Sequence, residues 1–196
     1  MNGLRADLAV IARLIEPGSR VLDVGCGDGQ LLAELEAKRA VDARGLELDP
    51  ELVERSVARG LSVVQGDANC DLCDYPDRAF DYVILSQTLQ TAQRPDQMLD
   101  ELLRVGRKVF VSFPNFAHWR TRAALLLGGR MPVTRALPLS WYETQNIHHV
   151  TVRDFSDLIA AKGVSTEAVW YFSGGRGIGA VGANWRAEFA LFKLSR

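Results

Sequence analysis

Hydrophobic residues at the start of the chain recur at the spacing of one helical face. The residues of this face are Leu4, Leu8, Ile11 and Ile15. Their separations of four, three and four positions predict a helix, and Pro17-Gly18 predicts its end. A short apolar run at residues 21–24 follows and predicts a buried strand.

Apolar runs and helical patterns then alternate along most of the chain. We expect strands over residues 21–24, 45–48, 61–65, 80–86, 108–113, 164–172 and 187–194. We expect helices from residue 30 onward and over residues 50–60, 95–106 and 151–163. Several early runs are continuously apolar, which is typical of a parallel sheet covered by helices on both faces. The pattern therefore predicts a single α/β domain over residues 1–196, doubly wound and Rossmann-like.

A glycine-rich turn joins the first predicted strand to the following helix. Gly25, Gly27 and Gly29 have the spacing G-x-G-x-G, and Asp23 precedes them by two residues. Glycines between a strand and a helix let the backbone approach a ligand closely. A dinucleotide-binding fingerprint requires a third glycine where this chain has Gln30, so the turn favours a different nucleoside ligand.

Two carboxylates follow the next two predicted strands. Glu47 lies 22 positions after Gly25, at a strand end where a carboxylate can bind ribose hydroxyls. Asp67 follows the third strand and can accept a hydrogen bond from an adenine amino group, with Leu48 and Ala68 beside the ring. Together with the glycine turn, these residues predict a nucleoside-binding site.

From about residue 17 to residue 113 the chain resembles the class I S-adenosylmethionine-dependent methyltransferases. The resemblance implies a mostly parallel seven-stranded sheet with an antiparallel last strand. It also implies S-adenosylmethionine or S-adenosylhomocysteine as the ligand. The implied binding residues are Asp23, Gly25, Cys26, Gly27, Gly29, Glu47, Leu48, Asp67, Ala68 and Ser86.

Candidates for a catalytic group are few. Ser86 and Gln87 follow the fourth predicted strand and would border a methyl-acceptor pocket, but neither is a general base. The N/D-P-P-Y/F signature of many amino-group methyltransferases is absent there. His148 can act as a general base near neutral pH, and a structural role for each of these three residues stays open.

Composition restricts the class of protein further. The 196 residues are 47% hydrophobic and 24% charged, as in ordinary globular domains. The net charge of −1 argues against nucleic acid or an anionic membrane as the main partner. No apolar run approaches the roughly 20 residues of a membrane span, and the first residues lack the pattern of a secretory signal. We therefore expect a cytoplasmic protein.

The cysteines do not predict a metal site. Cys70 and Cys73 form a lone C-x-x-C pair, and structural zinc needs four ligands. Cys26 belongs to the glycine turn, and three cysteines are an odd number for a disulfide framework. We expect no metal.

Residues 116–150 form an insertion with the composition of a contact surface. From Phe116 to Tyr142 there is no Asp or Glu, while arginines and large apolar residues are frequent. These are Arg120, Arg122, Arg130, Arg135, Trp119, Leu125, Leu126, Leu127 and Trp141. Arginine with aromatic residues is enriched at protein–protein interfaces. The insertion is either a helical lid over the protein's own pocket or a partner-binding surface, and residues 125–127 are a candidate homodimer contact.

The second half of the chain resembles the MetW family of methionine-biosynthesis proteins. The stretches that carry this resemblance are residues 111–116, 118–120, 137–138 and 141–148. The resemblance implies an accessory or regulatory subunit that partners homoserine O-acyltransferase (MetX), an α/β-hydrolase. The alternative is a methyltransferase acting on a small molecule, so the sequence leaves open whether the chain is itself an enzyme. A glycine-rich segment at residues 173–184 predicts only a flexible hairpin loop.

Overall fold

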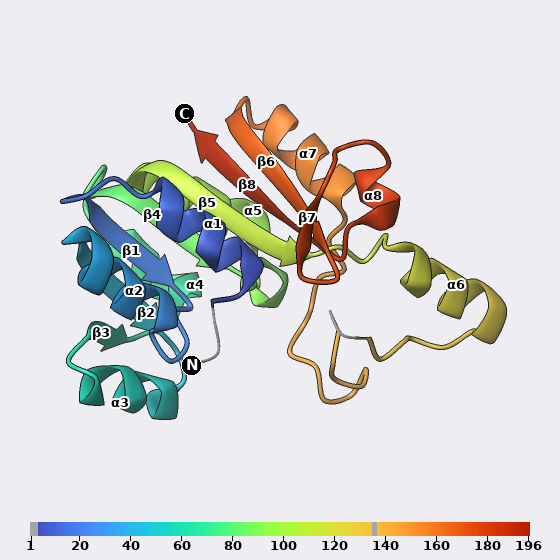
Figure 1. Ribbon diagram of the computed structural model, residues 1–196, viewed down its shortest axis with the longest axis horizontal. Helices are drawn as coiled ribbons and strands as arrows, with labels where there is room; N and C mark the ends of the chain where they lie inside the picture. The colour runs from blue at the N-terminus through green and yellow to red at the C-terminus, as the bar shows by residue number, and fades with distance from the viewer. Residues whose placement is uncertain (1–3, 135–136) are drawn as a thin grey trace.

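The structure is a computed structural model and describes residues 4–134 and 137–196 (Figure 1). Within these residues one sheet contains eight strands in the order β3-β2-β1-β4-β5-β8-β6-β7. The strands are β1 (Arg20–Val24), β2 (Asp42–Glu47), β3 (Ser62–Gln65), β4 (Phe80–Ser86), β5 (Gly106–Pro114), β6 (Ser165–Ser173), β7 (Arg176–Ile178) and β8 (Phe189–Ser195). The first five strands pair in parallel, and β8 lies antiparallel between β5 and β6.

This arrangement confirms the predicted doubly wound α/β fold and its antiparallel last strand. It differs from the prediction by one strand, because β7 pairs antiparallel with β6 and brings the sheet from seven strands to eight. Strand β7 has three residues and lies inside the glycine-rich segment for which the sequence predicts a loop. A strand this short has no alternation of apolar and polar residues, so no pattern in the chain indicates it.

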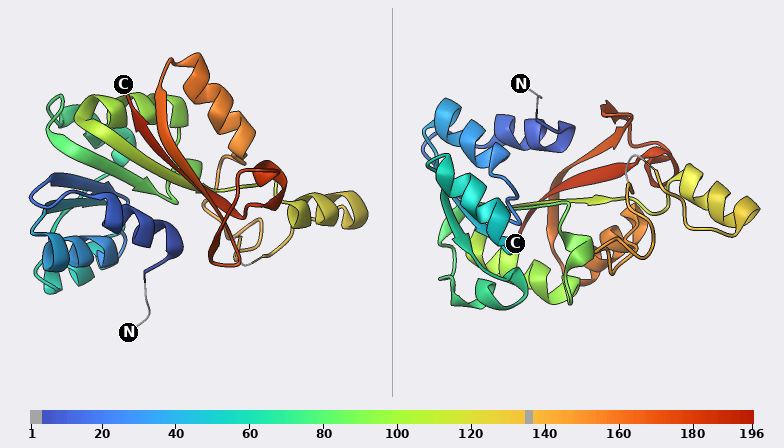
Figure 2. Two further views of the ribbon diagram at one scale, coloured as in Figure 1. Left: turned by 45° about the horizontal axis from the view of Figure 1, so that its top comes forward. Right: turned by 90° about the horizontal axis from the view of Figure 1, so that it is seen from below.

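Helices pack on both faces of the sheet (Figures 1 and 2). The helices are α1 (Ala6–Leu14), α2 (Gln30–Arg39), α3 (Pro50–Ala58), α4 (Ala68–Asp71), α5 (Pro95–Val105), α6 (Trp119–Gly128), α7 (Val152–Ala161) and α8 (Ala183–Arg186), with short 3₁₀ turns η1 (Leu72–Asp74) and η2 (Leu89–Thr91). Alternate residues of β4 point to opposite faces: Ile84 packs with α1 and α2, and Val83 packs with α5 and α7. Each face therefore has its own apolar core.

Several helix boundaries follow the signals in the sequence. Asp49 accepts a hydrogen bond from the backbone N–H of Glu51 (2.9 Å) and caps α3, which begins at Pro50. Thr151 accepts one from the N–H of Asp154 (3.1 Å) at the start of α7. Each of these residue types satisfies a backbone donor that the helix leaves free.

Helix α6 lies in the insertion, where a helical lid was one of the two interpretations of the sequence. It projects away from the sheet beyond the end of β5 (Figures 1 and 2). Its apolar residues are spread around the helix, so the spacing of an amphipathic face is absent. A helix that packs its side against a core needs such a face, and α6 does not pack in this way.

No helix in the described part of the chain is both long and apolar enough to cross a membrane.

Candidate functional site

The candidate site lies where the parallel strands end. In the sheet register, Val24 of β1 is level with Leu46 of β2 and Leu85 of β4, and Ser86 is level with Ser112 of β5. The glycine turn directly follows Val24, and Glu47 directly follows Leu46. Ser86 is itself one of the paired positions. Residues from four strands therefore meet at one edge, which is where open α/β sheets bind ligands.

The glycine turn is held in a backbone conformation that suits glycine. Gly25, Gly27 and Gly29 have φ angles of +70°, +60° and +73°. A Cβ at Gly25 would lie 2.5 Å from the Thr88 hydroxyl, whereas a Cβ at Gly27 would meet no atom within 4 Å. Gly25 and Gly29 are thus needed for packing, and Gly27 is the position where the turn faces open space.

Glu47 fixes the glycine turn to the end of β2. Its carboxylate accepts hydrogen bonds from the backbone N–H groups of Gly27 (2.7 Å), Leu48 (2.9 Å) and Asp49 (3.0 Å). A carboxylate has about four acceptor sites, so three are already occupied. One site remains, and a ligand can place one hydroxyl there without displacing a backbone donor.

Asp23 is buried beneath the turn at 3% exposure, and its Oδ1 has no hydrogen-bond partner among the described residues. Burial raises the pKa of Asp23 to about 7; the Glu47 and Asp7 carboxylates raise it too, while Arg5 opposes them. A buried carboxylate of this kind gains from a cation placed against it.

A second buried carboxylate, Asp7 of α1, was missed by the sequence analysis. Its Oδ2 accepts hydrogen bonds from Ser86 (2.9 Å), Ser112 (2.7 Å) and Arg5 (3.0 Å). Burial raises the pKa of Asp7, but the bonds and charge of Arg5 and the two hydroxyls outweigh this and hold the pKa below its ordinary value. The signal was present, since Asp7 lies three residues after Leu4 and four before Ile11, on the apolar face.

The predicted adenine-side residues lie at the ends of β2 and β3. Asp67 caps α4, its Oδ1 accepting from the backbone N–H of Asn69 (2.9 Å) and from the Asn69 side chain (2.8 Å). Its other carboxylate oxygen is not used in these bonds. Ala68 is half-buried against the core, and Leu48 is 62% exposed.

Cys26 has a packing role in this structure. Its side chain is buried with Leu31 and Leu32 below the turn, and burial raises the pKa of its thiol far above the ordinary value. Only the backbone of Cys26 therefore belongs to the turn surface. Cys70 and Cys73 are free and exposed, on α4 and η1.

The three catalytic candidates occupy connected positions. Ser86 is tied to Asp7, and Gln87 adopts φ +58°, a conformation that non-glycine residues rarely adopt. The Gln87 carbonyl accepts a hydrogen bond from the Gln90 side chain (2.6 Å), and the backbone N–H of His148 donates to the Gln90 carbonyl (3.0 Å). Gln90 thus connects the β4 turn to the insertion, a role that sequence reasoning did not assign.

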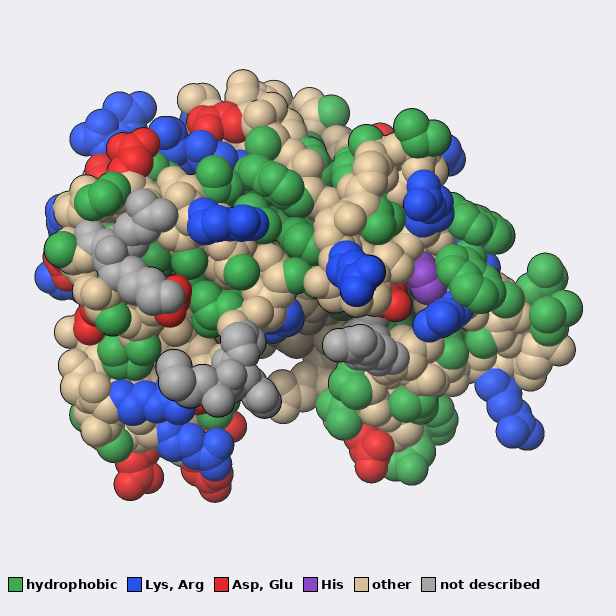
Figure 3. All heavy atoms as spheres, viewed as in Figure 1, with side chains coloured by type: hydrophobic (Ala, Val, Ile, Leu, Met, Phe, Trp, Pro, Cys, Tyr) green, Lys and Arg blue, Asp and Glu red, His purple; other side chains and the backbone are tan. Residues whose placement is uncertain are grey.

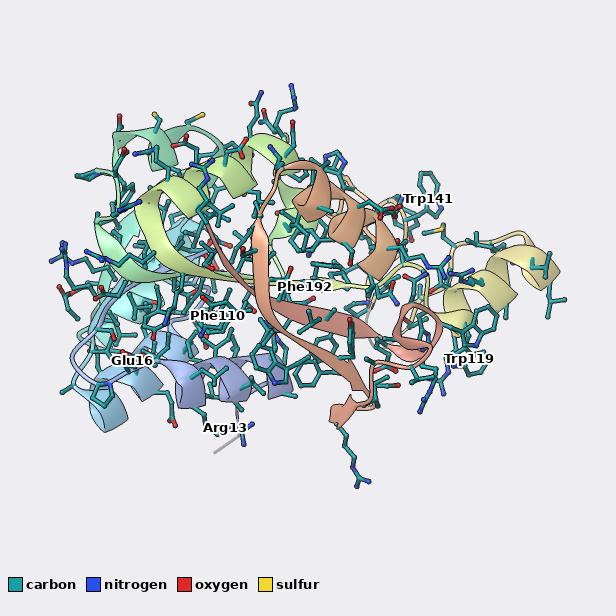
Figure 4. All side chains as sticks on the ribbon, turned by 90° about the horizontal axis from the view of Figure 1, so that it is seen from above. Arg13, Glu16, Phe110, Trp119, Trp141 and Phe192 are labelled. Atoms are coloured by element: carbon teal, nitrogen blue, oxygen red, sulfur yellow. The ribbon has the colours of Figure 1, made fainter. Side chains whose placement is uncertain are left out.

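The insertion at residues 116–150 has two parts. Helix α6 projects outward, while residues 137–139, 141, 143–146 and 149 contribute to the lining of a cavity of about 370 Å³ beside Gln87. Figure 4 shows Trp119 and Trp141 at this end of the molecule, far from the core residues Phe110 and Phe192. Of the four arginines in the insertion, Arg135 lies outside the described residues.

Solved structures with a similar fold include two methyltransferases. An S-adenosylmethionine-dependent methyltransferase from Mesorhizobium loti matches with a TM-score of 0.72 at 20% identity, covering 99% of both chains. One from Archaeoglobus fulgidus matches with a TM-score of 0.72 at 14% identity, covering 98% of this chain and 92% of that one. At these identities the likeness shows the class I methyltransferase type of fold alone.

The curated proteins that resemble this chain in sequence include two that differ in kind. The bifunctional methionine biosynthesis protein MetXA/MetW of Rhodopirellula baltica is 35% identical over 178 residues, which cover 85% of this chain and 29% of the relative. A ubiquinone biosynthesis O-methyltransferase of Xanthomonas oryzae pv. oryzae is 37% identical over 148 residues, covering 70% and 59%. The chain therefore spans less than two thirds of either relative.

The family model described as methionine biosynthesis protein MetW matches residues 5–194. The stretches on which the sequence resemblance rested all lie inside this range. The chain therefore belongs to the MetW family of methionine biosynthesis proteins.

Proposed function

We propose that this protein is an accessory subunit of homoserine O-acyltransferase that binds S-adenosylmethionine as a regulatory ligand. The observation that carries the proposal is helix α6, where Leu126 and Leu127 are both 85% exposed on a helix that projects from the body. The MetXA/MetW relative supports this partner, because its name joins the two proteins.

The surface of α6 has the chemistry of a protein contact. Arg120 lies over the Trp119 ring (5.3 Å from the ring centre), and Arg122 lies over the Trp185 ring (5.2 Å). Hydrophobic and basic side chains both appear at this end of the molecule in Figure 3. Exposed leucines beside arginines on aromatic rings favour a partner surface that combines apolar and acidic residues.

The residues at the strand ends fit S-adenosylmethionine, which carries a sulfonium and an ammonium cation. The unpartnered Oδ1 of Asp23 is suited to a cation, and the remaining acceptor site of Glu47 is suited to a ribose hydroxyl. Gly27 faces open space and leaves the turn accessible. In this proposal Asp67 accepts from the adenine amino group through its second carboxylate oxygen, and Leu48 lies beside the ring.

The partnership is tested by purifying this protein with the homoserine O-acyltransferase of the same genome. We expect one complex by light scattering and an acyltransferase rate that differs from the rate of the hydrolase alone. The double substitution Leu126→Ser and Leu127→Ser removes two exposed apolar side chains and should weaken the complex at least about tenfold. Val181→Ser, at 87% exposure outside the insertion, is the matched control and should leave the complex unchanged.

A complex that survives the double substitution would contradict the role of α6. No complex and no change of rate would contradict the partnership itself. Addition of S-adenosylmethionine to the intact complex then tests regulation, since a regulatory ligand must change the rate and a structural subunit is indifferent to it.

The second candidate function is a small-molecule methyltransferase. It is favoured by the cavity beside Gln87, which lies next to the proposed ligand site. Calorimetry with S-adenosylhomocysteine tests the ligand that both functions share. Release of S-adenosylhomocysteine from S-adenosylmethionine in the presence of an acceptor would then support the enzyme, and its absence with all acceptors tried would favour the subunit.

A further inference from the structure

Two free thiols lie three residues apart on one continuous helical segment. Cys70 belongs to α4, and Cys73 belongs to the 3₁₀ turn η1, which follows α4 without a break. Both side chains are exposed, and both residues line a groove of about 470 Å³ between this segment and α5. Cys26, the third cysteine of the chain, is buried at 9% exposure. A thiol reagent in solution therefore reaches Cys70 and Cys73 before it reaches Cys26.

The backbone brings the two exposed thiols within the range of a disulfide bond. Residues three apart in α or 3₁₀ backbone have Cα atoms about 5 to 6 Å apart, and a disulfide closes over about 4.4 to 6.8 Å. The side chain of Cys73 is turned toward Cys70, since its Sγ donates a hydrogen bond to the Cys70 carbonyl oxygen (2.9 Å). Closing the bond therefore requires rotation of the two side chains and little movement of the backbone.

The environment of Cys73 sets the order in which the two thiols react. Partial desolvation raises the pKa of Cys73 above its ordinary value, and the carboxylates of Asp74 and Glu101 raise it further. A thiol that keeps its proton is a weak nucleophile. Cys70 is therefore the thiol that attacks an oxidant first, and Cys73 reacts second.

We infer that Cys70 and Cys73 form a thiol–disulfide exchange site, which a low-molecular-weight disulfide converts into an intramolecular disulfide bond. The Cys70 sulfur attacks the small disulfide, so that a mixed disulfide forms on Cys70 and one small thiol leaves. The Cys73 sulfur then attacks the Cys70 sulfur and releases the second small thiol. Two protein thiols are oxidised, one small disulfide is reduced, and the two thiol protons pass through solvent to the departing thiolates.

One end of this segment is held in place by Arg104 of α5. Its guanidinium donates hydrogen bonds to the carbonyl oxygens of Leu72 (2.9 Å) and Tyr75 (2.7 Å), on both sides of Cys73. Ion pairs of Arg104 with Asp77 and Glu101 fix the guanidinium in turn. Since η1 is anchored in this way, closure of the disulfide displaces α4 more than η1.

The other end of the segment carries Asp67, the proposed adenine contact. The Asp67 carbonyl accepts from the backbone N–H groups of Cys70 (2.9 Å) and Asp71 (2.8 Å), and the Asp67 N–H donates to the Asp71 carboxylate (2.8 Å). A displacement of Cys70 is therefore passed to Asp67. The exchange itself rests on the two thiols alone, whereas its effect on a nucleoside ligand rests on the proposed function.

Mass spectrometry over a series of ratios of oxidised to reduced glutathione tests the exchange. The unmodified protein should lose the mass of two hydrogen atoms and retain no glutathione, with Cys26 still reduced. Cys73→Ser should instead retain one glutathione on Cys70, and Cys70→Ser should form no intramolecular bond. Because the second step is intramolecular, half-conversion of the unmodified protein should need at least about tenfold less oxidised glutathione than half-modification of Cys73→Ser.

The connection to Asp67 is measured on the reduced and oxidised forms of the unmodified protein. The ¹⁵N–¹H NMR signals of residues 67–71 should shift on oxidation without any ligand, while those of β1 stay in place. The affinity for S-adenosylhomocysteine, measured by calorimetry, should differ at least about fivefold between the two forms. The double variant Cys70→Ser and Cys73→Ser is the matched control and should give one affinity under both conditions.

A mixed disulfide that persists on the unmodified protein, or no reaction at all, would overturn the exchange site. Closure that leaves the signals of residues 67–71 unchanged would overturn the connection to Asp67, and equal affinities of the two forms would overturn the effect on the ligand. If S-adenosylhomocysteine does not bind the reduced protein, the proposed ligand fails, while the mass and NMR measurements still decide the exchange site and its connection to Asp67.

Discussion

Replacing the buried Asp23 by asparagine should remove a pH-dependent weakness in the fold. The raised pKa of about 7 means that folded Asp23 keeps a proton at pH values where the unfolded chain, with its ordinary pKa of 3.8, has released it. Stability therefore falls as pH rises from about 4 to about 7, because the folded state binds more protons in this window. Above the window the full cost of an ionised buried carboxylate is present.

The size of the effect follows from the shift. Each pH unit within the window changes the free energy of unfolding by about 1.4 kcal/mol. Between about pH 5.5 and pH 8, Asp23 should therefore cost the unmodified protein about 2 kcal/mol of stability. An asparagine side chain cannot ionise, so the Asp23→Asn protein should gain about that amount relative to the unmodified protein over the same interval.

Urea unfolding of both proteins at the two pH values measures this difference. Comparing the proteins at each pH cancels the titration of all other groups. Asp42→Asn, at an exposed position on β2 paired with Arg44, is the control and should give the same small difference at both pH values. An Asp23→Asn difference that does not change between the two pH values would refute the raised pKa.

Ligand binding should show the opposite trend. At about pH 6 roughly one tenth of Asp23 is ionised, so a cationic ligand that requires the carboxylate should bind about tenfold more weakly than at about pH 8. Calorimetry with S-adenosylmethionine should give this ratio for the unmodified protein and a flat, weaker affinity for Asp23→Asn. Binding that is independent of pH would contradict the pairing of Asp23 with the cation.

Three further substitutions test other parts of the structure. Gly29→Ala should lower the free energy of unfolding by at least about 2 kcal/mol in urea titrations, because φ is +73° and a Cβ would overlap the Leu61 side chain; a neutral result would refute the strain. Asn115→Leu should cost about 3 kcal/mol in the same assay, since the buried amide makes hydrogen bonds at both ends that join the start of α7 and the end of α8 to the end of β5; a loss below about 1 kcal/mol would contradict this. Glu47→Gln should weaken S-adenosylhomocysteine binding about tenfold or more in calorimetry, because an amide nitrogen cannot accept from the N–H of Gly27; unchanged affinity would exclude Glu47 from the site.

The parts of the fold that the sequence predicted are those with local signals. An apolar run such as residues 80–86 is by itself enough to indicate a buried strand. Asp49 and Thr151 each cap a helix by accepting a hydrogen bond from a backbone N–H two or three residues later. The glycine turn is local in the same sense, since its positive φ angles need glycine at those positions. These features are fixed by near neighbours, so a pattern in the chain is enough to identify them.

The parts that were missed depend on contacts between distant residues. Asp7 meets Ser86 and Ser112 across 79 and 105 residues of chain, and no local pattern encodes that meeting. The same applies to Gln90, whose backbone carbonyl accepts from the N–H groups of Ile147 and His148 in the insertion. Helix α6 has no amphipathic spacing, so no pattern gives its bounds, and its contact between Arg122 and the Trp185 ring of α8 joins residues distant in sequence.

The position of β8 determines the order in which the molecule can be completed. This strand lies between β5 and β6, although residues 189–195 are synthesised after both. Until they leave the ribosome, β5 has an open edge made of buried apolar residues such as Phe110 and Phe113, and the β6–β7 hairpin has no place in the sheet. An open apolar edge invites association with other chains, so the unfinished protein is most exposed to aggregation in this interval. Ser112, which donates a hydrogen bond to Asp7 at the site, lies on β5. The site therefore becomes rigid only when β8 has paired with β5.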